Sequence, residues 1–485
     1  MSGRLVGGLS VMWRTVRRVV VGHLDDVSGG GWHTRAVVVF ALVFGLSTAD
    51  TSTVGASATQ LRNAFGISNT QIGLLVSITA IVGALASLPF GVLADRVRRT
   101  WTLAIVVATW GLAMLGNAAA ANYEQLLVGR IFLGVVTAAA GPIIASLVGD
   151  YFAPSHRGRV YGYVLAGELL GAGFGFAVTG DVATLSWRAA FIVLALPAFA
   201  LAVVVWRLPE PARGESSRAP EAEDETGPTD AQRLARRRGI GPDPDLVLHG
   251  DLRRMGLVAA AKHILRIRTN LVLIFAGALG YYFLAGVQTF GVEYVKKEYG
   301  ITQVVATLLL LFVGIGAVIG VLAGGRVGDA LLGRGHLNGR LVTAAVAGTL
   351  AIVLFVPAIF TRGLLVGAIF LLGAAFGLSA QNPPLDAARL DIMPPPLWGR
   401  AESVRTFVRS GAQAVAPVLF GAVADNVFGG GRSGLQWTFA VMLVPLVVGT
   451  GLIYLGLGTF PQDVATAAAA TDRDEEGHGL GRAAA

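Results

Sequence analysis

Two carboxylates interrupt apolar stretches of the sequence. Asp50 lies in the polar patch of residues 47–53, and Glu168 lies among the glycines of residues 167–175. A carboxylate within hydrocarbon is costly unless it faces a water-filled cavity or a charged partner, and such residues often mark proton paths. Their chemistry would be the uptake and release of a proton. The structural alternative is that Asp50 is hydrogen-bonded to nearby hydroxyls and that the glycines around Glu168 only allow close helix packing.

Further polar residues within apolar runs are candidates to act beside these carboxylates. Arg130 could assist proton transfer or bind an acidic group, or its side chain could instead extend to the outer interface. Other polar residues could line a substrate cavity or could join helices by hydrogen bonds; they are Thr51, Thr137, Gln288, Gln381, Asn382 and Gln413.

The sequence offers no signal for an enzyme, a metal site or a cofactor. It has no cysteine, its seven histidines are scattered, and it contains neither a phosphate-binding glycine loop nor a nucleophile elbow. The net charge of +8 lies in short loops without interleaved aromatic residues, so it does not favour nucleic acid. We therefore expect neither catalysis nor a cofactor.

The elements that must hold these residues are apolar runs long enough to cross a bilayer. Hydrophobic residues make up 54% of the chain and charged residues 14%, about half the usual charged fraction. A transmembrane helix needs about 20 apolar residues. Runs of this kind fall near 35–57, 70–93, 101–120, 124–148, 159–180, 187–207, 270–292, 302–324, 340–360, 363–384, 403–424 and 435–458. They predict an all-α membrane protein of twelve transmembrane helices.

The runs divide into two halves of six helices, 35–207 and 270–458, joined by a polar linker at 208–269. Lys and Arg are concentrated in the loops that place both termini in the cytoplasm, including a loop at 388–409. The linker predicts a disordered acidic part followed by cytoplasmic surface helices, and the tail at 459–485 predicts disorder. Residues 1–34 predict an interfacial helix rather than a signal peptide, since their apolar run is short.

An internal repeat relates the two halves. Five residues around one turn recur 241 positions later, with Asp150 matching Asp391 and Pro142 matching Pro383. A second pair of motifs ends the second helix of each half. Carboxylates and arginines at these helix ends could form latches that break as the halves move, or the arginines could only anchor the inner face. The gating candidates are Gly91, Asp95, Arg96, Arg99, Asp150, Arg159, Asp329, Asp391 and Arg400.

The segment 91–99 closely resembles the loop signature that follows the second helix in the major facilitator superfamily. The stretch 391–403, the pair Ala49 and Asp50, and Arg130 followed by Gly134 resemble the Spinster-like branch of that superfamily. This resemblance implies a two-half facilitator fold that works by alternating access and carries lysophospholipids or sphingolipid phosphates. The chain departs from the branch at Thr51, where an arginine is usual, and at Thr137, where a glutamate is usual.

These observations predict a monomeric, multi-pass transporter of the cell (inner) membrane. It would couple protons, through Asp50, Glu168 and Arg130, to transport of a lysophospholipid-like amphipathic small molecule across the lipid bilayer. Two alternatives stay open. A proton-driven exporter of drugs or hydrophobic metabolites would fit the glycine-rich fifth run, and a transport-inactive membrane receptor or scaffold would fit the same spans.

Overall fold

The computed structural model describes residues 31–94, 97–152, 160, 163–164, 167–168, 170–211, 229–248 and 255–483, and most of these form helices. Within them, eleven helices are long and apolar enough to cross a membrane, and a shorter apolar helix spans Leu170–Leu185. Together they correspond to the twelve predicted runs. The predicted interfacial helix at 1–34 and the acidic part of the linker fall almost entirely outside the described residues. By packing, the chain divides into two units.

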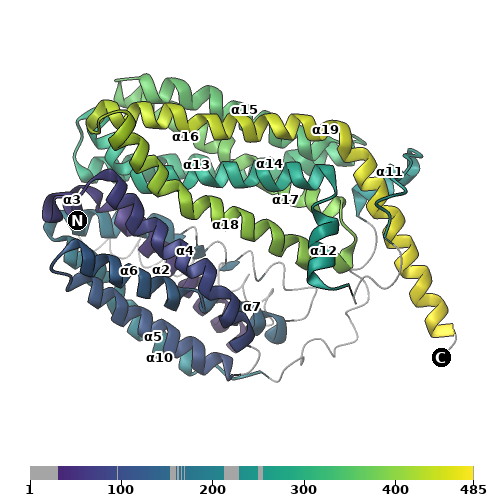
Figure 1. Cartoon of the computed structure of the whole chain (residues 1–485), viewed down its shortest axis with the longest axis horizontal. Coiled ribbons are helices and arrows are strands. Elements are labelled where there is room, and N and C mark those ends of the chain that lie inside the picture. The colour runs from purple at the N-terminus through teal and green to yellow at the C-terminus, as the bar shows by residue number, and fades with distance from the viewer. Residues whose placement is uncertain are drawn as a thin grey trace, which may run out of the picture. The chain divides into compact units, whose positions relative to one another are not determined.

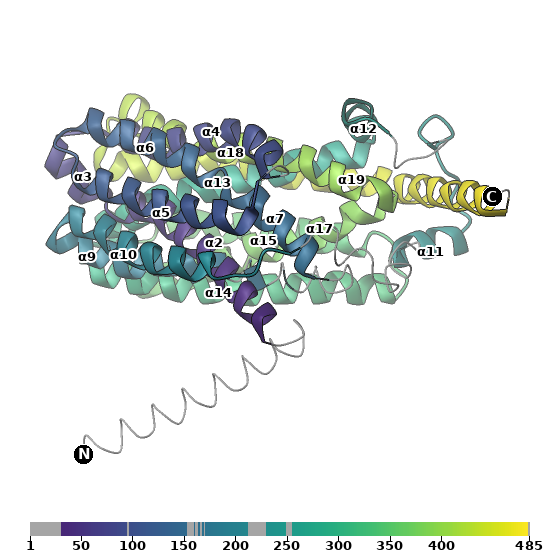
Figure 2. The same ribbon diagram turned by 90° about the horizontal axis from the view of Figure 1, so that it is seen from below.

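Unit 1 comprises Met1–Ser57 and Val82–Glu225. Its long helices α10 and α5 pack side by side, and α10 also contacts α2 (Figure 2). The fourth predicted run is interrupted at Ala138 and Ala139, because Pro142 lacks the N–H that would bond to the Ala138 carbonyl. The described helices of this unit are α2 (Trp32–Ala56), α5 (Arg99–Ala118), α6 (Tyr123–Thr137), α7 (Ala140–Tyr151), the π-helix η1 (Gly175–Thr179), α9 (Gly180–Leu185) and α10 (Trp187–Trp206).

The glycines of the fifth run allow it to lie directly against α2. A Cβ atom on Gly171 would collide with the backbone of Gly45, and one on Gly175 would collide with the backbone of Ala49. Small residues at four-residue spacing are the usual means of such close approach in membranes. The packing role predicted for these glycines is therefore confirmed.

Unit 2 comprises Ala58–Ile81 and Thr226–Ala485. Its helix α19 packs against both α13 and α15, and α14, α15 and α16 pack against one another (Figure 1). They are α3 (Ala58–Phe65), the first part of α4 (Asn69–Ala94), α11 (Asp230–Arg237), α12 (Leu257–Ile264), α13 (Arg268–Tyr299), α14 (Gln303–Gly333), α15 (Gly339–Phe360), α16 (Leu364–Ala380), α17 (Asn382–Asp391), the 3-10 turn η5 (Pro395–Leu397), α18 (Trp398–Ala422), the π-helix η6 (Val423–Val427) and α19 (Gly431–Ala483).

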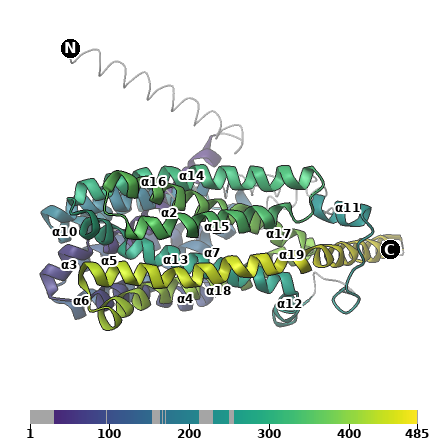
Figure 3. The same cartoon turned by 90° about the horizontal axis from the view of Figure 1, so that it is seen from above.

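The predicted disorder of the tail is wrong for most of its length. α19 continues without a break to Ala483, and α11 of the linker lies beside it (Figure 3). Residues 465–470 are mostly alanine, the strongest helix former. Phe460 and Val464 are fully buried, and Arg236 of α11 donates to the Ala468 carbonyl at 3.2 Å. Helix propensity and packing on the linker together explain why the helix persists.

Two segments expected at the cytoplasmic surface are more ordered than the sequence suggested. Thr229 caps α11 in a capping box with Gln232, whose side chain also donates to the Asp391 carbonyl at 3.1 Å. The predicted loop at 388–409 is short, because α17 ends at Asp391 and α18 begins at Trp398. Arg405 and Arg409 therefore lie within a transmembrane helix rather than in a loop.

Candidate functional site

Asp50 and Arg130 form a buried ion pair in unit 1. Asp50 comes from α2 and Arg130 from α6, and Nη1 of Arg130 lies 2.7 Å from Oδ1 of Asp50. Their side chains are 2% and 1% exposed. Hydroxyls around Asp50 bond back along α2, as Thr53 does to the Ala49 carbonyl at 2.7 Å, which keeps this polar patch helical. The sequence predicted both residues as candidates, and the structure brings them together.

This pair has the chemistry needed to exchange a proton. A buried carboxylate beside a guanidinium can hold a negative charge only while the two stay close, because an uncompensated charge in such a place is strongly destabilising. Adding a proton to Asp50 removes the negative charge that Arg130 faces. A protonation event at Asp50 is thereby linked to the position of the arginine and of the two helices that carry the pair.

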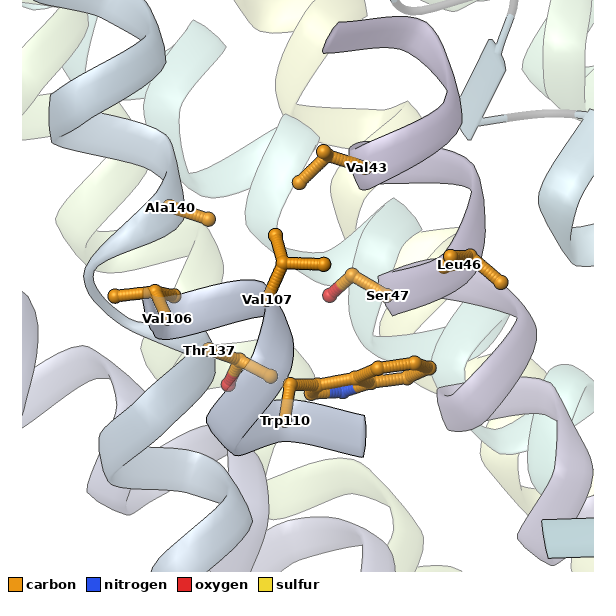
Figure 4. A pocket seen from close by; sticks show the side chains of 8 residues that line it. All are labelled: Val43, Leu46, Ser47, Val106, Val107, Trp110, Thr137 and Ala140. Atoms are coloured by element: carbon orange, nitrogen blue, oxygen red, sulfur yellow. The ribbon is translucent and has the colours of Figure 1, made fainter. Parts of the chain in front are cut away.

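A small cavity in unit 1 lies at the break between α6 and α7 and is also lined by residues of α2 and α5 (Figure 4). Its volume is about 30 Å³, enough for a water molecule. Ser47 precedes Asp50 by about one helical turn on α2. Trp110 of α5 lines the cavity, and its buried Nε1 has no hydrogen-bond partner within the described part of the chain. The full lining is Val43, Leu46, Ser47, Val106, Val107, Trp110, Thr137 and Ala140.

At one end of unit 1, Arg99 holds the start of α5 to two other segments. Its buried guanidinium pairs with Asp150 of α7 and with Glu210, a residue that follows α10. Nε of Arg99 lies 3.0 Å from Oε1 of Glu210. Glu210 also accepts from the N–H of Thr100 at 2.9 Å and from its hydroxyl at 2.7 Å. Burial alone would raise the pKa of Glu210, but the hydrogen bonds from Thr100 and Arg99 outweigh it and lower the pKa.

Unit 2 contains an equivalent cluster at positions related by the internal repeat. Arg340 of α15 pairs with the buried Asp391 at 2.5 Å and with the exposed Asp329 at 2.8 Å. Arg340 follows Arg99 by the same 241 positions that separate Asp391 from Asp150. Sequence reasoning named both aspartates but missed Arg340. Extending the repeat offset to Arg99 would have found it.

Unit 2 also contains a cluster of charged residues around Glu293. The Glu293 side chain is only 2% exposed. Its Oε2 accepts from Arg62 at 2.7 Å, and its Oε1 lies 2.6 Å from Lys297. Asp425 accepts from the Asn69 side chain at 2.6 Å. The early segment 58–81 is thus tied to α13 and η6 by polar contacts.

The other predicted site residues do not converge on these clusters. Thr51 is exposed and donates to the Ser47 carbonyl at 3.3 Å. Gln381 is 3% exposed. Glu168, Gln288, Asn382 and Gln413 are half-buried, Arg400 lies in the first turn of α18, and Gly91 lies near the end of α4. Asp95, Arg96 and Arg159 lie outside the described residues.

With regard to metals, the described residues contain no group of three or more His, Cys, Asp or Glu side chains that could hold an ion.

The comparison with known families defines the class of protein. The sequence profile of the Major Facilitator Superfamily matches residues 40–417, more than three quarters of the chain. The chain belongs to this superfamily, and it is a multi-pass membrane transporter of small molecules rather than an enzyme. The predicted family and fold are confirmed.

Curated relatives match shorter stretches. Spinster of Drosophila melanogaster is 26% identical over 224 residues, which are 46% of this chain and 37% of that protein. The 4-hydroxybenzoate transporter PcaK of Pseudomonas aeruginosa is 32% identical over 181 residues, which are 37% of this chain and 40% of that protein. This chain therefore aligns with less than half the length of these relatives.

Solved structures match over nearly the whole chain. A bacterial homolog of the human lysosomal transporter Spinster, in an inward-facing conformation, gives a TM-score of 0.70 at 18% identity and covers 90% of this chain and 99% of its own. A D-xylose-proton symporter gives a TM-score of 0.62 at 16% identity, covering 87% and 97%. At these identities the likeness establishes the fold.

Proposed function

We propose that the protein is a proton-coupled secondary transporter of an amphipathic, lysophospholipid-like molecule, with Asp50 and Arg130 as its coupling pair. The buried ion pair between α2 and α6 is the observation that carries this proposal. Glu168, half-buried in the fifth run, is the second coupling candidate. The likeness to Spinster supports the lipid-like substrate.

The mechanism follows from the electrostatics of the pair. With Asp50 ionised, its attraction to Arg130 holds α2 and α6 in one arrangement. A proton reaching Asp50 from one side of the membrane weakens that attraction and favours a second arrangement. Release of the proton on the other side restores the pair. Because each arrangement exposes the site to one side, proton flow drives substrate flow.

A second candidate substrate class is a small organic acid. The relatives include a transporter of 4-hydroxybenzoate, so an aromatic acid is a reasonable competitor to a lysolipid. Both substrate classes carry an oxyanion, and both suit a site that contains an arginine. Which of them is carried is decided by transport measurements rather than by the fold.

The test is uptake into proteoliposomes that contain the purified protein. Lysophosphatidylcholine, lysophosphatidate, 4-hydroxybenzoate and a cationic dye are offered with and without an imposed pH gradient. We expect accumulation of a lysolipid that depends on the gradient and disappears when a proton ionophore is added. Accumulation that is unaffected by the ionophore would exclude proton coupling. Accumulation of the dye alone would favour an exporter of hydrophobic cations.

A further inference from the structure

Arg409 is a charged residue in the first half of the candidate membrane span Arg400–Val427. It lies eleven residues after the start of α18, or roughly 16 Å along the helix axis. Within the hydrocarbon region an arginine is rare and costly, and it is retained mainly where it faces a water-filled cavity or a partner.

Tyr281 of α13 lies against the face of the arginine. The guanidinium carbon of Arg409 is 4.7 Å from the centroid of the Tyr281 ring, a cation–π arrangement. This contact holds the plane of the guanidinium but uses none of its N–H groups. Nε of Arg409 is buried and has no hydrogen-bond partner among the described residues.

Two nearby acids, Asp386 and Glu402, contact two other arginines and also attract Arg409 electrostatically. Arg389 lies 2.6 Å from Asp386 and 3.0 Å from Glu402. Nε of Arg405 donates to Glu402 at 3.0 Å. Among the described side chains of this cluster on α17 and α18, two carboxylates are balanced by two arginines, and Arg409 is a third positive charge. Asp386 and Glu402 are 51% and 50% exposed, so the cluster borders an accessible space rather than a closed core.

We infer that Arg409, held by Tyr281, recognises an oxyanion of the transported molecule, a carboxylate or a phosphate. The inference rests on the proposed transport function and adds the chemistry of the substrate head group and the residue that binds it. The planar guanidinium offers pairs of parallel N–H donors that match the two oxygens of such a group. The surplus positive charge disfavours a cationic head group at the same place.

Equilibrium binding tests this inference without any transport step. The full-length protein in lipid nanodiscs is titrated with octyl phosphate, octanoate, 4-hydroxybenzoate and octyltrimethylammonium, and empty nanodiscs correct for partitioning into lipid. The wild type is expected to bind at least one of the anions and to bind the cation more weakly. Octyl phosphate and 4-hydroxybenzoate distinguish a lipid-like source of the oxyanion from a small aromatic acid.

Three variants assign the binding to Arg409. Arg409→Gln is expected to weaken anion binding at least about tenfold, as for a lost charge-assisted hydrogen bond. Arg409→Lys keeps the charge without the planar fork and is expected to remain weaker than the wild type. Arg362→Gln removes a charge from an exposed outer turn and is expected to bind like the wild type.

Wild-type affinity for the anions in folded Arg409→Gln would overturn the inference, and so would a wild type that binds none of them. If Arg409→Gln fails to fold, Arg409→Lys provides the test instead. Anion affinity equal to that of the wild type in Arg409→Lys would refute bidentate binding by Arg409. Proton coupling is measured separately by accumulation under a pH gradient. If the wild type accumulates substrate under a pH gradient and Arg409→Gln binds the anions as tightly as the wild type, this inference is refuted. The proposed transport function would then still stand.

Discussion

The guanidinium of Arg340 contacts one buried and one exposed carboxylate, so the contributions of the two ion pairs to stability can be compared directly. Asp391 is 1% exposed and Asp329 is 64% exposed, yet both lie within 3 Å of Arg340. Arg340→Gln strands the negative charge of Asp391 in a buried site, which costs about 3–5 kcal/mol of unfolding free energy. Asp329→Asn removes an exposed partner and costs about 0–1 kcal/mol. The loss of unfolding free energy from Asp391→Asn is expected to lie between these two values. This variant leaves no unpaired buried carboxylate, and Asp329 can still pair with Arg340.

The assay is the reversible unfolding of the purified protein in mixed micelles, followed by circular dichroism. The double variant Arg340→Gln/Asp391→Asn is expected to be more stable than Arg340→Gln alone, since it removes the stranded carboxylate together with its partner. Equal losses from Arg340→Gln and Asp329→Asn would refute the reasoning. They would mean that the burial of Asp391 does not govern the energy of this cluster.

Three further predictions follow from other parts of the chain. The pKa of Glu210 is lowered in the folded protein, so ionised Glu210 stabilises the fold. The free energy of unfolding is therefore expected to fall as the pH drops below about 4. In an acid unfolding titration, Glu210→Gln should reduce this loss of stability. Trp110→Phe removes a buried N–H that has no partner among the described residues, so the thermal stability should be unchanged or higher; a loss above about 1 kcal/mol would mean that a bound water satisfies this group. Accessibility tags at 225 and 480 should react only from the cytoplasm and a tag at 361 only from outside, and labelling of 225 and 361 from one side would contradict the predicted topology.

Much of the helical framework could be predicted from the sequence, because a span is a local property. About 20 apolar residues in a row identify a transmembrane helix wherever they occur. The close packing of the fifth run on α2 was likewise readable from the spacing of Gly167, Gly171 and Gly175. The helical tail was missed because charge and glycine content were weighed above the alanine run and above packing on α11.

The site was predictable only in part, because it depends on which helices meet. Asp50 and Arg130 each stood out as charges within apolar runs, but nothing local in the sequence shows that they pair. The pairing of Glu293 with Arg62 could not be predicted, because the two residues are far apart in the chain. Arg409 was overlooked because a basic residue near the end of an apolar run resembles a cytoplasmic anchor until the bounds of the helix are known.

The account depends most on Asp50 as a coupling carboxylate. Asp50→Asn keeps the shape of the side chain but cannot ionise, and Glu168→Gln makes the same change at the second candidate. Each variant is reconstituted, and accumulation of the identified substrate under a pH gradient is compared with exchange of labelled for unlabelled substrate without one.

We predict that Asp50→Asn abolishes accumulation driven by the gradient while exchange remains measurable, because the substrate path survives the loss of proton coupling. Accumulation by Asp50→Asn to the wild-type level, with the wild-type dependence on pH, would contradict the central role of the pair between Asp50 and Arg130.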